Sequence, residues 1–374
     1  MKPTIHQPVH EPIEPCGVVL GAGLLALDIV MSDVSGEPQK QWAGGTCGNV
    51  LIALAYLGWE AKPVARLRTG NAADRILLDL KEWGVSGEFV SVARDGSTPV
   101  IFERITRGSG DIPRHSFSWR CPDCGIQFPG FKSVLSSVAE EIAQKSGPVQ
   151  VFFFDRATPA SIILAKSCAD RGGLVVFEPS SVGNALHFRQ AWETAHIVKY
   201  SHERLRELPE VNVARSPLLQ IETLGEAGLR YRKVLRNGRS GEWIRMEAFR
   251  VDVVRDTAGS GDWCTAGIID CCGHSGAAGF IELKKDELES SIRYGQALAA
   301  WNCGFEGARG GMYAIDRETF LQQVSHIFEG GSGLVSDSVA FRGRGNTFVG
   351  GLCPACEEAD IGKSVTGTDG STSH

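Results

Sequence analysis

The stretch Val254-Arg255-Asp256-Thr257-Ala258-Gly259-Ser260-Gly261-Asp262-Trp263-Cys264-Thr265-Ala266-Gly267 joins a β-like run to an apolar run that ends at Cys272. Its small residues let the backbone approach an anion closely. A helix that begins here would aim free N–H groups and the positive end of its dipole at that anion. The carboxylate of Asp262 stands at the junction, where it can face a bound hydroxyl group. The pattern predicts a site that holds a transferred phosphoryl group and accepts the nucleophile's proton.

Length and composition predict an ordinary globular protein. The 374 residues suffice for one large α/β domain or two smaller ones, and 43% of them are hydrophobic. The net charge of −6 gives no basic footprint for nucleic acid. We find no run of 18 apolar residues, so we expect no membrane span, and the N-terminus lacks the segments of a signal peptide. Cysteines such as Cys168, Cys271 and Cys272 lie in apolar helical contexts, which favours a reducing, cytoplasmic compartment.

The middle of the chain alternates apolar strands with helical patterns. We expect strands at 149–154, 174–178 and 196–199, and helices at 133–144, 159–171, 263–272, 286–302 and 316–328. Upstream we expect a buried strand over 17–23 that continues through 24–30, helices over 50–57 and 72–83, and short strands within 88–120. Because the central strands are nearly all apolar, they favour a parallel sheet that helices cover on both faces.

Three further patterns each have a structural and a functional interpretation. Asp28 lies inside an apolar strand, so it is either a hydrogen-bonded structural acid or a carboxylate that grips substrate hydroxyls. The pattern Gly44-Gly45-x-x-x-Asn49 opens a helix and is either a tight turn or a substrate site. Thr223-x-Gly225-x-x-Gly228 ends a strand in a turn that is common in α/β proteins and also suits a nucleotide.

These three patterns, followed by Asp256-Thr257-x-Gly259-x-Gly261-Asp262, resemble the signatures of the ribokinase-like (PfkB) carbohydrate kinases in their order along the chain. The resemblance covers about residues 16–328. It implies an α/β fold, a three-layer α/β/α sandwich with a small β-lid near 88–120. It also implies an ATP-dependent kinase that phosphorylates a primary hydroxyl group of a sugar or related small molecule.

The resemblance also implies roles for single residues. Asp262 would be the catalytic base, and the N–H groups of Gly259, Ser260 and Gly261 would form the anion hole. The substrate would be bound by Asp28, Gly44, Gly45 and Asn49. The nucleotide would involve Lys199, Thr223, Gly225, Gly228, Asp256 and Thr257. Asp256 and the carbonyl oxygen of Ala258 would form a site for a monovalent cation such as K⁺. Because a helix N-terminus lowers a carboxylate pKa, we expect Asp262 to be charged at neutral pH.

One position departs from the family pattern. The family commonly has Asn-x-x-Glu where this chain has Ser201-His202-Glu203-Arg204, and the glutamate helps to hold Mg²⁺ through water. Either Glu203 substitutes for it, or nucleotide phosphates and water hold the ion, since magnesium often keeps most of its waters. A third interpretation is a degenerate enzyme, against which the intact Asp262 and its neighbouring glycines argue.

Two Cys-Pro-x-Cys pairs predict a metal site outside this pattern. Cys121 and Cys124 form the first pair, and Cys353 and Cys356 form the second. Each has the spacing of a zinc knuckle, and two of them would complete a tetrahedron of thiolates. One pair alone would leave zinc, redox chemistry and packing open, but neither has a thioredoxin-like context. We therefore expect one structural Zn²⁺, with chance cysteines in loops as the alternative.

The expected organisation is a loose arm (1–15), a kinase domain (16–328), a C-terminal extension (329–359) and a disordered tail (360–374). Two alternatives to a sugar kinase remain: a nucleoside kinase of the same fold, and a zinc-bearing binding protein on a catalytically weak kinase fold. We expect a small-molecule partner and neither nucleic acid nor membrane. A homodimer stays open, since relatives often pair through their lids.

Overall fold

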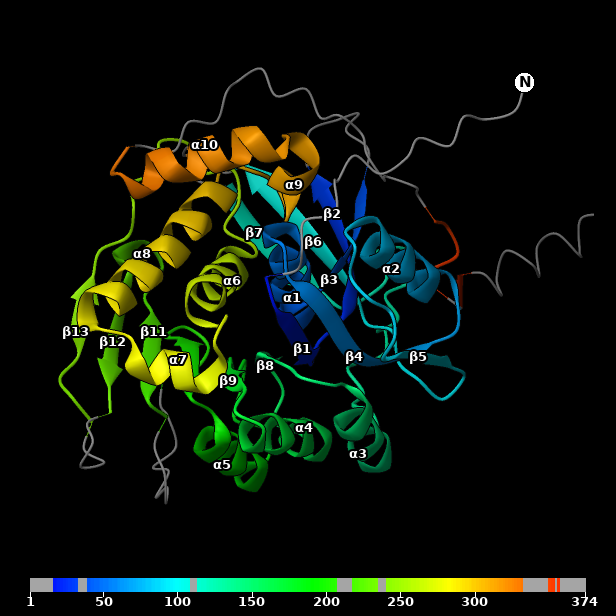
Figure 1. Cartoon of the computed structure of the whole chain (residues 1–374). Coiled ribbons are helices and arrows are strands. Elements are labelled where there is room, and N and C mark those ends of the chain that lie inside the picture. The colour runs from blue at the N-terminus through cyan, green and yellow to red at the C-terminus, as the bar shows by residue number, and fades with distance from the viewer. Residues whose placement is uncertain are drawn as a thin grey trace, which may run out of the picture.

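The computed structural model describes residues 16–32, 39–107, 113–206, 217–234, 240–331, 349–353 and 355–356. The expected arm and tail lie outside these residues, as does most of the expected extension. Within them the chain forms a layered body with a second, smaller sheet beside it (Figure 1). None of the helices described combines the length and the apolar character needed to cross a bilayer.

The described residues include a large sheet of nine strands. In order across the sheet they are β13 (Ile244–Met246), β12 (Leu229–Lys233), β11 (Leu219–Thr223), β10 (Ile197–Ser201), β9 (Leu174–Phe177), β8 (Val151–Phe154), β1 (Val18–Ala22), β4 (Glu60–Arg68) and β5 (Val90–Ala93). The strands from β11 to β5 pair in parallel, and β12 and β13 are added antiparallel at one edge. The strand order changes direction at β1, which lies between β8 and β4.

Helices cover both faces of this sheet. The core cluster on one face includes α1 (Thr46–Leu57), α2 (Asn71–Glu82), α6 (Ser260–Cys272), α7 (Gly276–Glu282), α8 (Lys285–Asn302), α9 (Gly310–Ala314) and α10 (Arg317–Phe328). The cluster on the other face includes α3 (Ser136–Lys145), α4 (Pro159–Asp170) and α5 (Ala185–Thr194). We did not expect the two short helices α7 and α9, nor α5. The predicted three-layer α/β/α fold is confirmed.

The alternation of the strand residues explains the two cores. In β8, Val151 and Phe153 join one cluster, whereas Phe152 and Phe154 join the other. Successive side chains of a strand point to opposite faces, so a strand that is covered on both sides must be apolar throughout. All four of these side chains are fully buried. The continuous apolar run is therefore a reliable sign of a central strand in this chain.

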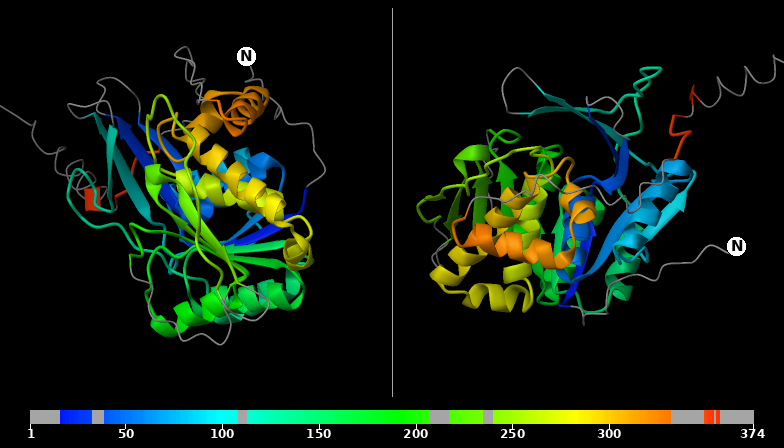
Figure 2. Two further views of the ribbon diagram at one scale, coloured as in Figure 1. Left: turned by 90° about the vertical axis from the view of Figure 1, so that its left-hand side faces the viewer. Right: turned by 90° about the horizontal axis from the view of Figure 1, so that it is seen from above.

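A second sheet of four strands stands beside the layers (Figure 2). Its order is β3 (Lys40–Gly44), β2 (Ala26–Ser32), β6 (Val100–Arg107) and β7 (Pro113–Ser118). We expected the lid from residues 88–120, but only β6 and β7 of that stretch belong to this sheet, because β5 pairs with β4 in the large one. The predicted continuous strand over 17–30 was wrong. The chain bends after Ala22, and β1 and β2 enter different sheets.

Candidate active site

The carboxyl ends of the central strands bring polar residues to one edge of the large sheet. Asp155 directly follows β8, Glu178 directly follows β9, and Thr223 ends β11. In open α/β sheets, ligands bind beyond these ends, where the strand order reverses. Here that point is β1. The topology therefore indicates a site above β1 and its neighbours.

Helix α6 begins at this edge as the sequence predicted. Gly259 is its N-cap, with a left-handed φ of 71°, and no side chain caps the helix. A Cβ atom at Gly259 would lie 2.4 Å from the carbonyl oxygen of Ala308, so only glycine fits. The N–H group of Ser260 donates to the carbonyl oxygen of Thr257 at 3.2 Å. Of the three donors that we predicted for an anion, the Ser260 N–H is thus engaged with the preceding turn.

Asp262 lies in the first turn of α6 and contacts the predicted substrate residue Asn49. The Asn49 amide donates to Oδ2 of Asp262 at 2.8 Å. Asn49 lies near the start of α1, so the first turns of two helices meet here. The two residues are 213 positions apart, and the structure brings them together as one unit.

The structure contradicts the charge that we predicted for Asp262 at neutral pH. Burial and then the negative charge of Glu178 raise the Asp262 pKa to about 8, although the Asn49 hydrogen bond and the cations Arg204 and Lys199 oppose the rise. The helix-terminus argument considered only the dipole, whereas loss of water around a buried carboxylate is the larger effect. The raised pKa therefore favours the protonated form of Asp262 near neutral pH.

The buried Lys199 and the partly buried Glu178 form an ion pair beneath α6. The Lys199 ammonium donates to Glu178 Oε1 at 2.6 Å and to the carbonyl oxygen of Gly261 at 3.0 Å. The hydroxyl of Thr265 donates to the other Glu178 oxygen. Burial works against the charge of Lys199, but the adjacent Glu178 holds the Lys199 pKa above its usual value. The pair thus supports the first turn that carries Asp262.

Our sequence reasoning missed Glu178 and Asp155, although both share a readable signal. Each is an acid that comes directly after an all-apolar run, at Phe154-Asp155 and Phe177-Glu178. An acid at such a place lies at the carboxyl edge of a parallel sheet. Asp155 is 1% exposed and accepts a hydrogen bond from the backbone N–H of Leu24. It therefore fixes the bend that follows β1.

Asp28 of β2 faces the turn that contains Gly44 and Gly45. The N–H group of Gly45 donates to Asp28 Oδ2 at 3.4 Å, and Oδ1 is buried with no hydrogen-bond partner among the described residues. A Cβ atom at position 44 would lie 1.8 Å from Asp28 Oδ2. Any residue other than glycine would therefore collide with Asp28 at this position. Burial raises the Asp28 pKa to about 6, against the Gly45 hydrogen bond and the charge of Arg309. Oδ1 of Asp28 thus keeps an unused capacity to accept a hydrogen bond.

Arg309 orients Asn49, and our sequence reasoning missed it. Its guanidinium donates to Asn49 Oδ1 at 3.2 Å, to Asp79 of α2 at 2.9 Å and to the carbonyl oxygen of Ala43. Arg309 is 1% exposed and Asp79 is fully buried. The carboxylate of Asp79 also accepts the hydroxyl of Tyr313. No local pattern could reveal this network, because its members come from three distant segments.

The predicted nucleotide loop follows β11. Thr223 ends the strand, and Gly225 begins a short 3₁₀ turn (Gly225–Ala227) that Gly228 closes. The N–H group of Leu224 donates to the carbonyl oxygen of Gly228 at 2.8 Å, which fixes the loop. The loop emerges at the same edge of the sheet as the first turn of α6. The structure thus places the two predicted phosphate-side elements on one side of the large sheet.

Asp256, which we predicted to bind the cation, and Thr257, which we predicted on the nucleotide side, lie just before α6. The Asp256 carboxylate accepts the N–H groups of Ala258 at 3.0 Å and Gly307 at 2.8 Å. Asn302 donates to the Ala258 carbonyl oxygen at 2.7 Å. The carboxyl groups of Glu103 in β6 and of Asp256 share a hydrogen bond. Burial is the main cause that raises the Glu103 pKa well above its usual value, and the negative charge of Asp256 is the next. Protein partners therefore hold both oxygen ligands that we predicted for the cation.

A comparison with known protein families shows to which family this chain belongs. The pfkB family carbohydrate kinase model matches residues 30–314, more than two thirds of the chain. The chain belongs to the pfkB family of carbohydrate kinases. The matched region contains every predicted substrate, nucleotide and catalytic residue except Asp28, which lies two positions before it.

Solved structures of pfkB-like kinases share the fold. A fructokinase with bound ATP from Xylella fastidiosa is 18% identical with a TM-score of 0.60, covering 78% of this chain and 93% of that chain. An aminoimidazole riboside kinase from Salmonella enterica is 21% identical with a TM-score of 0.59, covering 83% and 99%. A nucleoside kinase from Burkholderia thailandensis in complex with inosine is 19% identical with a TM-score of 0.58, covering 83% and 98%.

Proposed function

We propose that this pfkB-family chain transfers the terminal phosphoryl group of ATP to a primary hydroxyl group of a sugar or a related small molecule. The contact between Asn49 and Asp262 carries the proposal. It sets a carboxylate and an amide side by side at the uncapped N-terminus of α6, where a hydroxyl and a phosphoryl group can meet. The unpartnered Asp28 oxygen supplies a further acceptor for a substrate hydroxyl.

In the proposed step, the substrate hydroxyl oxygen forms a bond to the γ-phosphorus while the bond from that phosphorus to the bridging oxygen breaks. ADP leaves with the electron pair of the broken bond, and the hydroxyl proton passes to the Asp262 carboxylate. Asp262 must be deprotonated for this role, so its raised pKa favours turnover at mildly alkaline pH. The N–H groups of Gly259 and Gly261, together with the helix dipole, would stabilise the charge on the transferred group.

We also propose that nucleotide phosphates and water hold Mg²⁺, which would neutralise charge on the phosphates. Glu203 and Arg204 are both exposed. Because magnesium often keeps most of its waters, this interpretation needs no protein carboxylate in place of the missing glutamate. A K⁺ ion at Asp256 would require some of its present hydrogen bonds to rearrange.

A nucleoside acceptor is the second candidate. Phe117 of β7 and the nearby Trp119 are 43% and 46% exposed, and such rings can stack on a base. The test is ADP release from ATP and Mg²⁺ with a panel of sugars and nucleosides, followed by mass spectrometry of the product. Phosphorylated sugar supports the proposal, and phosphorylated nucleoside selects the second candidate. Substrate binding without any turnover across the panel would favour the binding-protein alternative.

The remaining expectations are also proposals. A cytoplasmic location would follow from an ATP-consuming small-molecule enzyme with its cysteines reduced. A homodimer that pairs through the four-stranded sheet is testable by sedimentation velocity on the full chain.

A further inference from the structure

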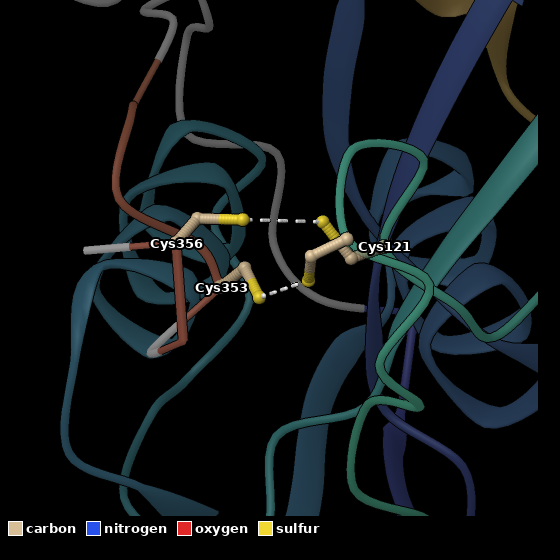
Figure 3. A group of neighbouring side chains, drawn as sticks. Cys121, Cys353 and Cys356 are labelled. Carbon is tan, nitrogen blue, oxygen red and sulfur yellow. Dashed lines mark hydrogen bonds between the residues drawn. The ribbon is translucent and has the colours of Figure 1, made fainter. Parts of the chain in front are cut away.

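Four cysteine sulfurs from two distant segments converge outside the proposed active site. Cys121 and Cys124 lie in the turn after β7, and Cys353 and Cys356 lie near the end of the described chain (Figure 3). The Cys121 and Cys356 sulfurs are 3.8 Å apart, the Cys124 and Cys353 sulfurs are 3.5 Å apart, and all four lie within 4.8 Å of one another. All four are free thiols.

These spacings match a tetrahedral metal site. Zinc–sulfur bonds of about 2.3 Å in a regular tetrahedron separate neighbouring sulfurs by about 3.8 Å. The Cys121–Cys356 and Cys124–Cys353 separations lie at or just below this value. A disulfide needs a bond of about 2.05 Å, which no pair approaches. The geometry fits one central ion better than two cross-links.

The backbone arranges each sulfur pair independently of the other. In the first turn, the N–H group of Gly125 donates to the Cys121 carbonyl oxygen, and the Cys121 N–H group donates to the Ile126 carbonyl oxygen, both at 2.9 Å. In the second, the Cys356 N–H group donates to the Cys353 carbonyl oxygen at 3.1 Å. Each turn therefore presents two thiols in one direction.

We propose that the four thiols bind one Zn²⁺ as thiolates and that this ion braces the four-stranded sheet. Binding converts four thiols and one Zn²⁺ into a tetrathiolate complex with release of four protons, with no change in oxidation state. Zinc suits the site because it favours four sulfur ligands in a tetrahedron. With four protein ligands no open position remains, so the role is structural.

The position of the C-terminal segment explains the bracing role. The backbone of Val349 exchanges two hydrogen bonds with the Gln41 side chain of β3, at 3.0 and 3.3 Å. The Asn71 amide of α2 donates to the Gly350 carbonyl oxygen at 2.9 Å. The segment is thus tied to β3 and α2 at one end and meets the turn after β7 at the other.

The metal would therefore link both edges of the four-stranded sheet. β3 and β7 are its two edge strands in the order β3-β2-β6-β7. β3 continues into Gly44 and Gly45, which face Asp28 of β2. A cross-link stabilises a folded chain most when the loop that it closes is long. The loop that the metal would close runs from residue 124 to residue 353.

The first test is metal content in full-length protein that has been purified without chelator. We expect about one zinc per chain by elemental analysis, and tetrahedral thiolate bands after replacement by cobalt. The double variant Cys121→Ser/Cys353→Ser should lose the metal, whereas the control Cys16→Ser, which removes an exposed thiol outside the cluster, should keep it. Iron instead of zinc, or no metal with all four thiols open to alkylation, would overturn the assignment.

The second test uses wild-type protein and needs no variant that might misfold. Removal of the metal by a chelator should speed amide hydrogen exchange in residues 121–128 and 349–353, and to a smaller degree in β3. Exchange in β8 and β9, which lie in the centre of the large sheet, should be unchanged. Equal exchange in all these segments with and without the ion would refute the bracing role. Both tests are independent of phosphoryl transfer.

Discussion

Opposing electrostatic influences set the pKa of the Asp262 carboxyl group. The α6 dipole, Lys199 and the Asn49 amide favour its charged form, whereas burial and Glu178 disfavour it. The result is a pKa of about 8, close to the range in which a base is most effective. A general base in the proposed step must be within reach of the hydroxyl and must also exchange its proton near neutral pH.

Replacement of the proposed base should remove turnover and spare nucleotide binding. Asp262→Asn keeps the side-chain shape but removes the proton acceptor, so we expect kcat to fall by about 10²- to 10⁴-fold. Calorimetry with a non-hydrolysable ATP analogue should show nearly unchanged affinity. The control is Asp270→Asn, the same substitution on the same helix at a residue that pairs with Trp59. Near-normal kcat for Asp262→Asn would remove this residue from the catalytic role.

Replacement of Glu178, the partner of Lys199, should shift the pH dependence of kcat/KM. Glu178 raises the Asp262 pKa by its charge, so Glu178→Gln should lower that pKa and leave Lys199 free to stabilise the carboxylate. Because the deprotonated base is the active form, the acid limb of kcat/KM, which reports the free enzyme, should move to lower pH. Glu140→Gln, at an exposed residue of α3, should leave the profile unchanged. A shift to higher pH in Glu178→Gln would contradict this electrostatic account.

Helix α6 is the element on which the site depends, and its start is fixed by backbone conformation. Gly259 and Gly84 share a φ of 71°, but a Cβ at Gly259 would meet the Ala308 carbonyl oxygen, whereas a Cβ at Gly84 meets nothing within 4 Å. The two positions therefore separate the cost of a left-handed residue from the cost of displacing the helix. This is a matched pair within one chain.

We expect both alanine variants to lose stability and only one to lose activity. Gly84→Ala should cost about 1–2 kcal/mol for the left-handed conformation alone, and kcat should be retained. Gly259→Ala should cost more and should lower kcat by about 10²-fold, because a shift of the first turn displaces Asp262. Urea unfolding and steady-state kinetics measure the two effects. Equal kcat in the two variants would show that the start of α6 tolerates displacement.

At the scale of the whole molecule, Arg309 ties the four-stranded sheet to helices of the layered body. It contacts β3 through Ala43, α2 through Asp79 and α1 through Asn49. Asn49 in turn contacts Asp262 of α6. Removal of the guanidinium would leave the buried Asp79 carboxylate without its closest cation, which is more costly than loss of an exposed ion pair.

Arg309→Met should therefore destabilise the protein by about 3–5 kcal/mol. The control Lys145→Met breaks the exposed pair between Lys145 and Glu141 and should change stability by no more than about 1 kcal/mol. Urea unfolding measures both variants. If Arg309→Met still folds at low temperature, kcat should fall because Asn49 loses its orienting partner. A loss within 1 kcal/mol for Arg309→Met would contradict the central place of this network.

Patterns along the amino-acid sequence were enough to predict the layered fold and the start of helix α6. Continuous apolar runs such as 151–154 identify strands buried on both faces, since the side chains of a strand alternate between two cores. The glycines before Asp262 predicted the start of α6, because a left-handed residue and close backbone approach require glycine. These properties depend on neighbours along the chain, so they are readable without a structure.

The influence of distant residues on one another became visible only in the assembled fold. The raised Asp262 pKa depends on burial and on Glu178, which is 84 positions away, and the orientation of Asn49 depends on Arg309, which is 260 positions away. The separation of β1 from β2 into two sheets likewise follows from pairing with β8 and β6. Water exclusion and long-range pairing arise when the layers close, and no local pattern records them.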